Sequence, residues 1–245
     1  MIINYKKKFI FIHNPKTAGT SIEVHLSKLR EADDFHIGSL VDNNKTTPLK
    51  FSKKMIFNSL KNPSLSAIKN AILSKNFREF VEGSNKMSFG KKFAIQPQNA
   101  YATEIKKYFN YEWNNFFKFC VVRNPWERIE SFYKWFDQRE IGFERFVKKL
   151  YSDSNFRDTF KGLDSRNYYE INGKICVDYI IKYENLNQDF NKILKKFSYP
   201  ETSNFPKFKI KNDSVKQTLQ TIEIIQEMFS EEISYFNYKP PKLNF

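Results

Sequence analysis

Two short segments of this 245-residue chain combine side chains that bind phosphate or sulfate groups. The first is residues 13–21 (HNPKTAGTS), which directly follows a short apolar run. A loop that enters a helix N-terminus presents backbone N–H groups and the positive end of the helix dipole, which together form an anion site. Lys16 adds a mobile positive charge, and Gly19 permits backbone conformations closed to other residues. Three hydroxyl side chains add further donors: Thr17, Thr20 and Ser21.

The second segment is residues 123–131 (RNPWERIES), which also follows an apolar run. Ser131 lies eight residues after Arg123, slightly more than two helical turns. The serine is therefore expected on roughly the same helix side as the N-terminus that faces Arg123. A guanidinium and a hydroxyl in that arrangement bind a phosphate group.

The order of residues in the first segment disfavours a nucleotide-hydrolysing P-loop. In a Walker A loop, glycines precede the lysine and a metal-binding hydroxyl follows it directly. Here Pro15 and Lys16 come first and Gly19 follows. The histidines, His13, His25 and His36, show no zinc-ligand spacing, so the sequence predicts no metal site.

Apolar patterns predict the strands and helices that hold these segments. Continuous apolar runs at residues 9–12, 116–122 and 175–181 are typical of strands buried on both faces of a parallel sheet. Helices are expected from Thr20, after Asn124, from Leu186, and from about residue 214 to 229 or beyond. Their expected inward residues are Ile22, Leu26 and Leu29; Ile129, Phe132, Tyr133 and Phe136; Leu186, Phe190, Ile193, Leu194 and Phe197; and Leu219, Ile222, Ile225 and Phe229.

The junction at residues 122–127 is the best determined of these boundaries. Asn124 is a suitable N-cap, Pro125 suits the first helical position, and Glu127 is spaced to complete a capping box. Trp126, Tyr133 and Trp135 are interpreted as core or helix-packing aromatics. Strands that alternate with helices imply a sheet flanked by helices.

Three blocks of the sequence resemble one known family in the order in which they occur. Residues 15–21 (PKTAGTS) look like the 5′-phosphosulfate loop of sulfotransferases that use 3′-phosphoadenosine-5′-phosphosulfate (PAPS), closest to the carbohydrate-type branch. Residues 119–133 (FCVVRNPWERIESFY) look like the same family's 3′-phosphate motif. Residues 177–190, with YENL at 183–186, resemble a downstream block of the bacterial family 2-like members.

The resemblance implies a fold and a reaction. The fold is α/β, a P-loop-NTPase-like three-layer arrangement with a central parallel sheet flanked by helices. The reaction is transfer of a sulfonate group from PAPS to a hydroxyl of a carbohydrate acceptor, without a metal ion. The implied nucleotide-binding residues are Lys16, Thr17, Ala18, Gly19, Thr20 and Ser21 at the 5′ end, and Arg123 and Ser131 at the 3′-phosphate. Lys16 is also implied as catalytic, because a lysine at the bridging oxygen stabilises the departing 5′-phosphate.

The general base is the part of the chemistry that the motifs do not supply. Related carbohydrate sulfotransferases often carry a histidine shortly before the second motif, and this chain has Asn99 there. Asparagine does not accept a proton at neutral pH, so we assign the base to His36. The other candidates are His13 beside the loop, His25 beside an apolar helix face and therefore expected in the core, Glu23 and Glu104.

Residues 33–92 are expected to form an irregular, acceptor-related insertion in a single domain that covers residues 1–245. Asn, Lys, Ser and Thr dominate this segment, with Pro48 and Pro63 as breakers and a short helix around residues 65–72. A tolerated surface insertion is an equally good interpretation. Near the C-terminus, residues 209–214 either contact the nucleotide or cap a helix.

Composition limits the partners without selecting a function. The net charge of +14 favours anionic partners such as a nucleotide, an acidic polymer or a membrane face, and equally fits a lysine-rich surface. No apolar run is long enough for a membrane span, and the two cysteines are expected as buried free thiols, so we expect a cytoplasmic protein. No recognition helix or basic arm indicates nucleic-acid binding. The alternatives are a P-loop nucleotide kinase and a catalytically impaired protein that binds PAPS or its desulfated product PAP.

Overall fold

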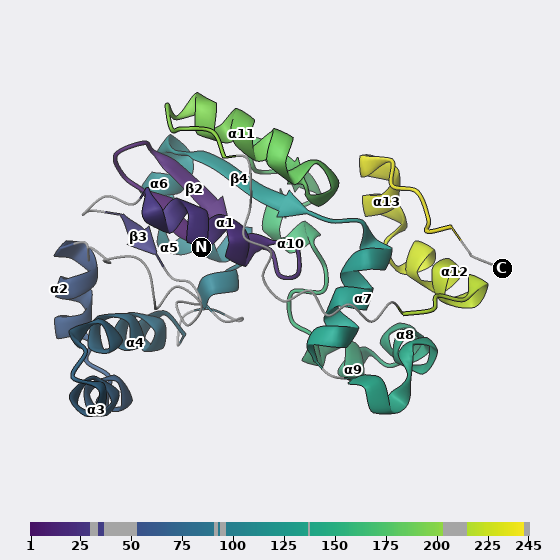
Figure 1. The fold of residues 1–245 in the computed structure, drawn as a ribbon, viewed down its shortest axis with the longest axis horizontal. Helices are drawn as coiled ribbons and strands as arrows, with labels where there is room; N and C mark the ends of the chain where they lie inside the picture. The colour runs from purple at the N-terminus through teal and green to yellow at the C-terminus, as the bar shows by residue number, and fades with distance from the viewer. Residues whose placement is uncertain are drawn as a thin grey trace.

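A five-stranded sheet with the order β3-β1-β2-β4-β7 forms the centre of the computed structural model (Figure 1). The model describes residues 1–29, 34–36, 53–90, 93, 97–136, 138–202 and 215–242. The sheet strands are β1 (Ile2–Asn4), β2 (Phe9–Ile12), β3 (Phe35–His36), β4 (Phe117–Val122) and β7 (Tyr179–Lys182). A separate two-stranded hairpin consists of β5 (Glu170–Ile171) and β6 (Lys174–Ile175).

The helices connect and cover these strands. The α-helices of the described residues are α1 (Gly19–Lys28), α2 (Lys53–Lys61), α3 (Leu65–Ser74), α4 (Phe77–Gly90), α5 (Ala102–Tyr108), α6 (Asn110–Asn115), α7 (Pro125–Trp135), α8 (Phe143–Ser152), α9 (Ser154–Thr159), α10 (Arg166–Tyr169), α11 (Leu186–Lys196), α12 (Leu219–Met228) and α13 (Ser230–Phe236). Short 3₁₀ turns are η2 (Pro97–Asn99), η3 (Gln138–Ile141) and η4 (Tyr183–Asn185).

The sheet separates two apolar layers, which confirms the three-layer α/β architecture. Alternate residues of β2 and β4 point to opposite faces, as the pleat requires. Ile10, Ile12 and Cys120 pack with α5 to α8 and α12 on one face. Phe11 and Phe119 pack with α1 and α11 on the other. The core strands β2, β4 and β7 are parallel, so their carboxyl ends lie at one edge.

The sheet is mixed rather than wholly parallel. β1 pairs antiparallel with β2 and with β3. Only residues 5–8 connect β1 to β2, and so short a connection allows antiparallel pairing but no parallel crossover. The expectation of a central parallel sheet therefore holds for β2, β4 and β7 and is wrong for the β1–β3 edge.

Several expected boundaries also shift. The strand expected at residues 175–181 divides into β6 and β7. The C-terminal helix was expected from about residue 214, but α12 begins at Leu219. The Leu219 side chain, expected inward, is exposed. Phe136 is also exposed, whereas Ile129, Phe132 and Tyr133 are buried as expected. Both cysteines are free: Cys120 is buried as expected and Cys176 is half-buried.

The expected irregular insertion is instead largely helical where the structure describes it. Residues 53–90 form α2, α3 and α4, and the short helix expected near Leu65 is confirmed as α3. α4 packs against both α2 and α3 (Figure 1). The many Asn, Lys, Ser and Thr residues of this segment and its two prolines indicated a loop by composition, although its apolar residues lie within helices. Residues 37–52 lie outside the described part of the chain.

Candidate nucleotide-binding and active site

Three functional segments begin where the three parallel strands end. Residues 13–18 follow β2, Arg123 follows β4, and Tyr183 follows β7. Because ligands of open α/β sheets bind at the carboxyl ends of the strands, this edge is the expected location of the site. The fold therefore brings together segments that are far apart in the sequence.

The loop between β2 and α1 has a strained backbone that is fixed by buried hydrogen bonds. Lys16 and Ala18 both have left-handed φ values, 63° and 68°. Each such conformation costs a non-glycine residue about 1–3 kcal/mol and is typical of functional sites. The Thr17 hydroxyl donates to the Asn14 carbonyl at 2.8 Å, so this buried side chain shapes the loop. Ala18 then serves as the N-cap residue of α1.

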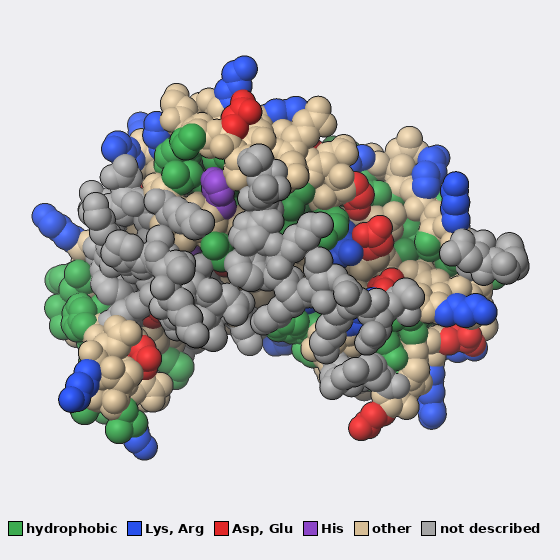
Figure 2. All heavy atoms as spheres, viewed as in Figure 1, with side chains coloured by type: hydrophobic (Ala, Val, Ile, Leu, Met, Phe, Trp, Pro, Cys, Tyr) green, Lys and Arg blue, Asp and Glu red, His purple; other side chains and the backbone are tan. Residues whose placement is uncertain are grey.

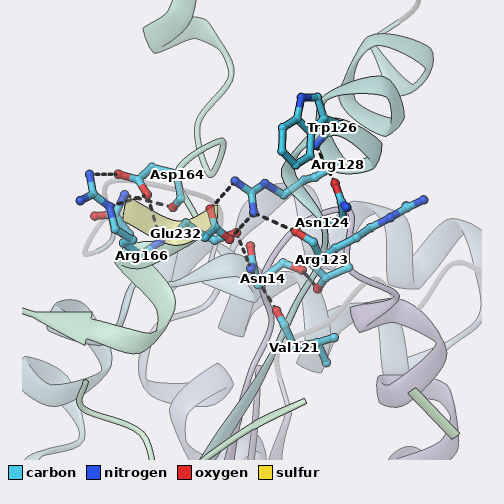
Figure 3. Close-up of polar contacts among 12 residues, drawn as sticks. Asn14, Val121, Arg123, Asn124, Trp126, Arg128, Asp164, Arg166 and Glu232 are labelled. Carbon is cyan, nitrogen blue, oxygen red and sulfur yellow. Dashed lines mark hydrogen bonds and ion pairs between the residues drawn. The ribbon is translucent and has the colours of Figure 1, made fainter. Parts of the chain in front are cut away.

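Asn14 ties the loop to the rest of the site. Its side-chain amide donates to the Val121 carbonyl and to the Ser165 hydroxyl, both at 3.0 Å (Figure 3). Asn14 and Ser165 are buried. A buried amide with two partners restricts the loop to one position, which is the preorganisation that an anion site requires.

Gly19 has a different role from the one expected. The left-handed residues of the loop are Lys16 and Ala18, and Gly19 itself does not have a positive φ. A Cβ atom at Gly19 would lie 2.1 Å from a ring carbon of His13. The glycine is therefore needed because the helix N-terminus approaches the His13 ring too closely for any side chain.

Arg123 reaches the loop directly. Its Nη1 donates to the Lys16 carbonyl at 3.4 Å, and its guanidinium lies 4.3 Å from the centre of the Tyr183 ring. Its Nε and Nη2 donate to Glu127 Oε2 at 3.2 and 3.1 Å. Glu127 is thus a partner of Arg123 and does not complete the expected capping box. Asn124 is confirmed as the N-cap of α7, because its Oδ1 accepts from the Trp126 amide.

The same face of α7 carries Ser131 and Trp135. Glu127, Ser131 and Trp135 are spaced four residues apart, so they lie in one row along the helix. The Lys16 Nζ lies 4.1 Å from the centre of the Trp135 ring. Lys16 therefore contacts both ends of this segment: its carbonyl accepts from Arg123, which precedes α7, and its ammonium lies over Trp135, the last residue of α7. The half-buried Ser131 lies between them on the helix.

Buried ionic contacts hold the second segment in place. Arg128 is completely buried, and its two terminal nitrogens donate to Glu232 at 2.6 and 2.7 Å (Figure 3). Arg128 Nη1 also donates to the Arg123 carbonyl at 3.3 Å. The backbone N–H of Asn124 donates to Glu184 Oε1 at 2.8 Å. Arg128 and Glu184 thus position the backbone from which Arg123 projects.

A buried charged cluster lies behind the loop. Glu23 Oε1 accepts from the Met1 amine at 2.6 Å and lies 3.0 Å from His13 Nδ1, and Glu23 Oε2 is 4.0 Å from His36 Nε2. Burial raises the pKa of the Glu23 carboxyl, but the neighbouring His13 and the Met1 amine outweigh burial and hold that pKa well below its usual value. The carboxylate is therefore ionised and supports the His13 ring against Gly19.

The candidate bases lie in different surroundings. The side chain of His36 is fully buried in β3 beside Glu23, and burial counts against it, because a general base must reach the acceptor hydroxyl. His25 is only half-buried, where the core was expected, and it packs edge-on against Phe190. Glu104 Oε2 accepts from the Tyr101 amide at 2.8 Å and caps α5. Asn99 is half-buried in η2. The assignment of the base to His36 stays a prediction.

The sequence pattern did not reveal the roles of Trp135, Tyr183 and Arg128. Trp135 was interpreted as a packing residue, and it is 52% exposed beneath Lys16. Its position twelve residues after Arg123, on the row through Ser131, was the available signal. Tyr183 follows a parallel strand directly, which is a signal for ligand-edge residues. Residues 209–214 lie outside the described part of the chain.

Comparison with known proteins agrees with this geometry. A model of the Sulfotransferase family matches residues 1–239. A protein of Archaeoglobus fulgidus, described only as uncharacterized, is 40% identical over 89 residues, which covers 34% of this chain and 68% of the relative. No solved structure matches the chain.

The chain belongs to the Sulfotransferase family, and the match covers nearly its whole length. It is therefore a transferase that uses PAPS as the donor. Among the residues that the structure describes, no helix is long and apolar enough to cross a membrane. The same residues contain no group of three or more His, Cys, Asp or Glu that could hold a metal ion.

Proposed function

We propose that the chain transfers the sulfonate group of PAPS to a hydroxyl of a carbohydrate acceptor, at the junction of the Lys16 loop and α7. The observation that carries the proposal is the pair of contacts that Lys16 makes, with Arg123 Nη1 just before α7 and with the Trp135 ring at the end of α7. It brings a mobile ammonium, a helix N-terminus and a guanidinium to one sheet edge. A nucleotide with anionic groups on both the 5′ and 3′ positions requires that combination.

The residues fit the two ends of the donor. The start of α1 and the strained loop supply backbone donors for the 5′-phosphosulfate, with the Lys16 ammonium beside them. Arg123 and Ser131 are placed for the 3′-phosphate. Glu127, now paired with Arg123, has a side chain that is 49% exposed, and such a surface pair is weak. A dianionic phosphate can therefore take over the guanidinium from Glu127.

The reaction needs charge stabilisation more than covalent chemistry. An acceptor oxygen forms a bond to sulfur while the bond from sulfur to the 5′-phosphate oxygen breaks, and negative charge builds on that phosphate. The Lys16 ammonium, leaving the Trp135 ring for that oxygen, would stabilise the charge in the transition state. The proton of the acceptor hydroxyl goes to a base, for which His36 remains the named candidate.

A cavity beside the site supports a carbohydrate acceptor. It has a volume of about 590 Å³, within the usual range for small-molecule sites, and its lining includes Tyr101, Asp158, Lys161, Asp164 and Asn167. Aromatic rings combined with amides and charges of both signs suit the faces and hydroxyls of a sugar. One wall residue, Asp164, directly precedes Ser165, the partner of Asn14 in the loop.

A second connection between this cavity and α7 supports the proposal. Phe160 of the lining contacts the ring of Phe136, with ring centres 5.0 Å apart. Phe136 follows Trp135, on which the Lys16 ammonium lies. The cavity lining is thus linked to the loop through Ser165 and Asn14, and to the end of α7 through Phe136.

The nucleotide assignment is tested with Arg123→Ala. We expect the affinity for PAP to fall about 10- to 100-fold, because a charge-assisted hydrogen bond to phosphate is lost. The affinity for adenosine 5′-phosphate should change little, since that nucleotide has no 3′-phosphate. Isothermal titration measures both. The exposed Arg145→Ala serves as the control for loss of one positive charge. Equal affinities of the unmodified chain for the two nucleotides would refute the assignment.

The acceptor assignment is tested with Asp158→Ala in the cavity lining. Once an acceptor sugar has been found by screening, this variant should raise its KM several-fold, about 1 kcal/mol for one hydrogen bond, with unchanged PAP affinity. Glu201→Ala, at an exposed position outside the lining, is the control. Turnover with a non-sugar hydroxyl compound and none with sugars would contradict the carbohydrate proposal.

A further inference from the structure

The three helices α2, α3 and α4, residues 53–90, are the helical insert. Among the described residues, fourteen large hydrophobic side chains are exposed, and half of them lie on this insert. These residues, each at least half exposed, are Phe57, Leu60, Leu65, Ile72, Leu73, Phe77 and Met87. Elsewhere, the exposed set consists of five aromatic residues spread over several helices and of the aliphatic residues Ile175 and Leu219. Scattered single hydrophobic residues are normal on a protein surface, but seven on one segment of 38 residues form a cluster that needs an explanation.

Helix α3 has its apolar face on the outside. It packs on α4 through Ala67, whose Cβ would be only 2.7 Å from a Cβ placed on Gly83. Leu65, Ile72 and Leu73 recur at i, i+7 and i+8, which defines one side of a helix, roughly opposite Ala67. A helix that buries its small residue and exposes its large aliphatic ones is arranged for a partner outside the chain.

The insert is also positively charged. It contains seven Lys or Arg and two Glu. Lys53, Lys61, Lys69 and Lys86 are exposed, and Lys75 is exposed at the end of α3. Lys69 lies on the same face of α3 as Leu65 and Ile72, because it is four residues after Leu65 and three residues before Ile72. Figure 2 shows hydrophobic and basic side chains together at the lower left, over α2 and α3.

We propose that the helical insert docks this protein on an anionic membrane surface, with the aliphatic residues of α3 in the headgroup region and the lysines on the lipid charges. Amphipathic helices with Leu, Ile or Phe beside lysines bind bilayers in this way. The charge argues against a second copy of the chain as occupant. A two-fold interface would place the same lysines opposite one another, which is repulsive.

Docking is tested with the full chain and lipid vesicles in a flotation experiment. We expect binding to phosphatidylcholine vesicles that contain about 30 mol% phosphatidylglycerol, and little binding to pure phosphatidylcholine. Raising the salt to ~0.5 M should weaken binding, because lipid–lysine attraction is screened. The triple variant Leu65→Ser/Ile72→Ser/Leu73→Ser should lower the bound fraction at least about tenfold.

Controls separate docking from folding defects. Ile175→Ser/Leu219→Ser removes exposed aliphatic residues outside the insert and should bind vesicles normally. All variants should keep the PAP affinity of the unmodified chain. The charge variant Lys61→Glu/Lys69→Glu/Lys75→Glu should also lose vesicle binding. Undiminished vesicle binding by the serine variant, or no binding of the unmodified chain to anionic vesicles, overturns the proposal. Self-association of the unmodified chain that the serine variant abolishes would assign the surface to a second copy instead.

Discussion

Replacing Lys16 with methionine is expected to lower kcat about 10²–10³-fold, the loss typical of one group that stabilises transition-state charge. Methionine keeps the Cβ atom, so the strain of the left-handed backbone at φ 63° is unchanged, and it keeps contact with the Trp135 ring. The affinity for PAP should fall by less, because the backbone donors of the loop and the Arg123 guanidinium remain. Steady-state kinetics and titration with PAP measure the two effects separately.

A matched control is Lys195→Met, which removes one exposed positive charge from α11. Its kcat should stay within about twofold of the unmodified enzyme, since surface charges away from the site are screened. A Lys16→Met enzyme with the same kcat as this control would show that Lys16 only binds the nucleotide. A lower affinity for PAP with an unchanged kcat would lead to the same conclusion.

Breaking the Arg128–Glu232 pair is expected to have the largest effect on stability. Arg128→Met leaves the buried Glu232 carboxylate without its bidentate partner, at a cost of about 3–5 kcal/mol. Urea unfolding measures this loss, and Tm should fall by roughly 10 °C. The double variant Arg128→Met/Glu232→Leu should recover much of the stability, because no buried charge remains.

The control is the exposed pair Lys148–Glu144, where Lys148→Met should change stability only slightly. The double variant Arg128→Met/Glu232→Leu also allows PAP affinity to be measured in a stable protein. Arg128 also donates to the Arg123 carbonyl, so we expect the double variant to be stable and still bind PAP more weakly. A stable double variant with normal PAP affinity would mean that Arg128 has no positioning role.

The strand–helix junctions could be predicted from the sequence because their signals are local. The apolar runs of β2 and β4, the cap at Asn124 and Pro125 in the first turn of α7 each depend on a few neighbouring residues. The two predicted anion-binding segments at these junctions could be located for the same reason. The structure also places Arg123 against the Lys16 loop, which the positions of the two motifs after parallel strands had implied.

Features that depend on contacts between distant segments could not be predicted. The left-handed conformations of Lys16 and Ala18 follow from the Asn14 contacts with Val121 and Ser165, which sequence spacing does not show. The antiparallel β1 edge is only three residues long, too short for a periodic signal. The burial of His36 depends on β3 pairing with β1. For α3 the helix was predictable, but its outward-facing apolar side was not.

The contact between Lys16 and Trp135 has a spectroscopic consequence. Of the three tryptophans in the chain, Trp113 and Trp126 are buried, whereas the indole of Trp135 is open to water and lies under an ammonium group. Water-soluble quenchers therefore reach one emitter selectively, and that emitter senses the position of the Lys16 ammonium. The chain thus carries its own fluorescent probe beside Lys16, the proposed catalytic lysine, and movement of Lys16 can be followed without an added label.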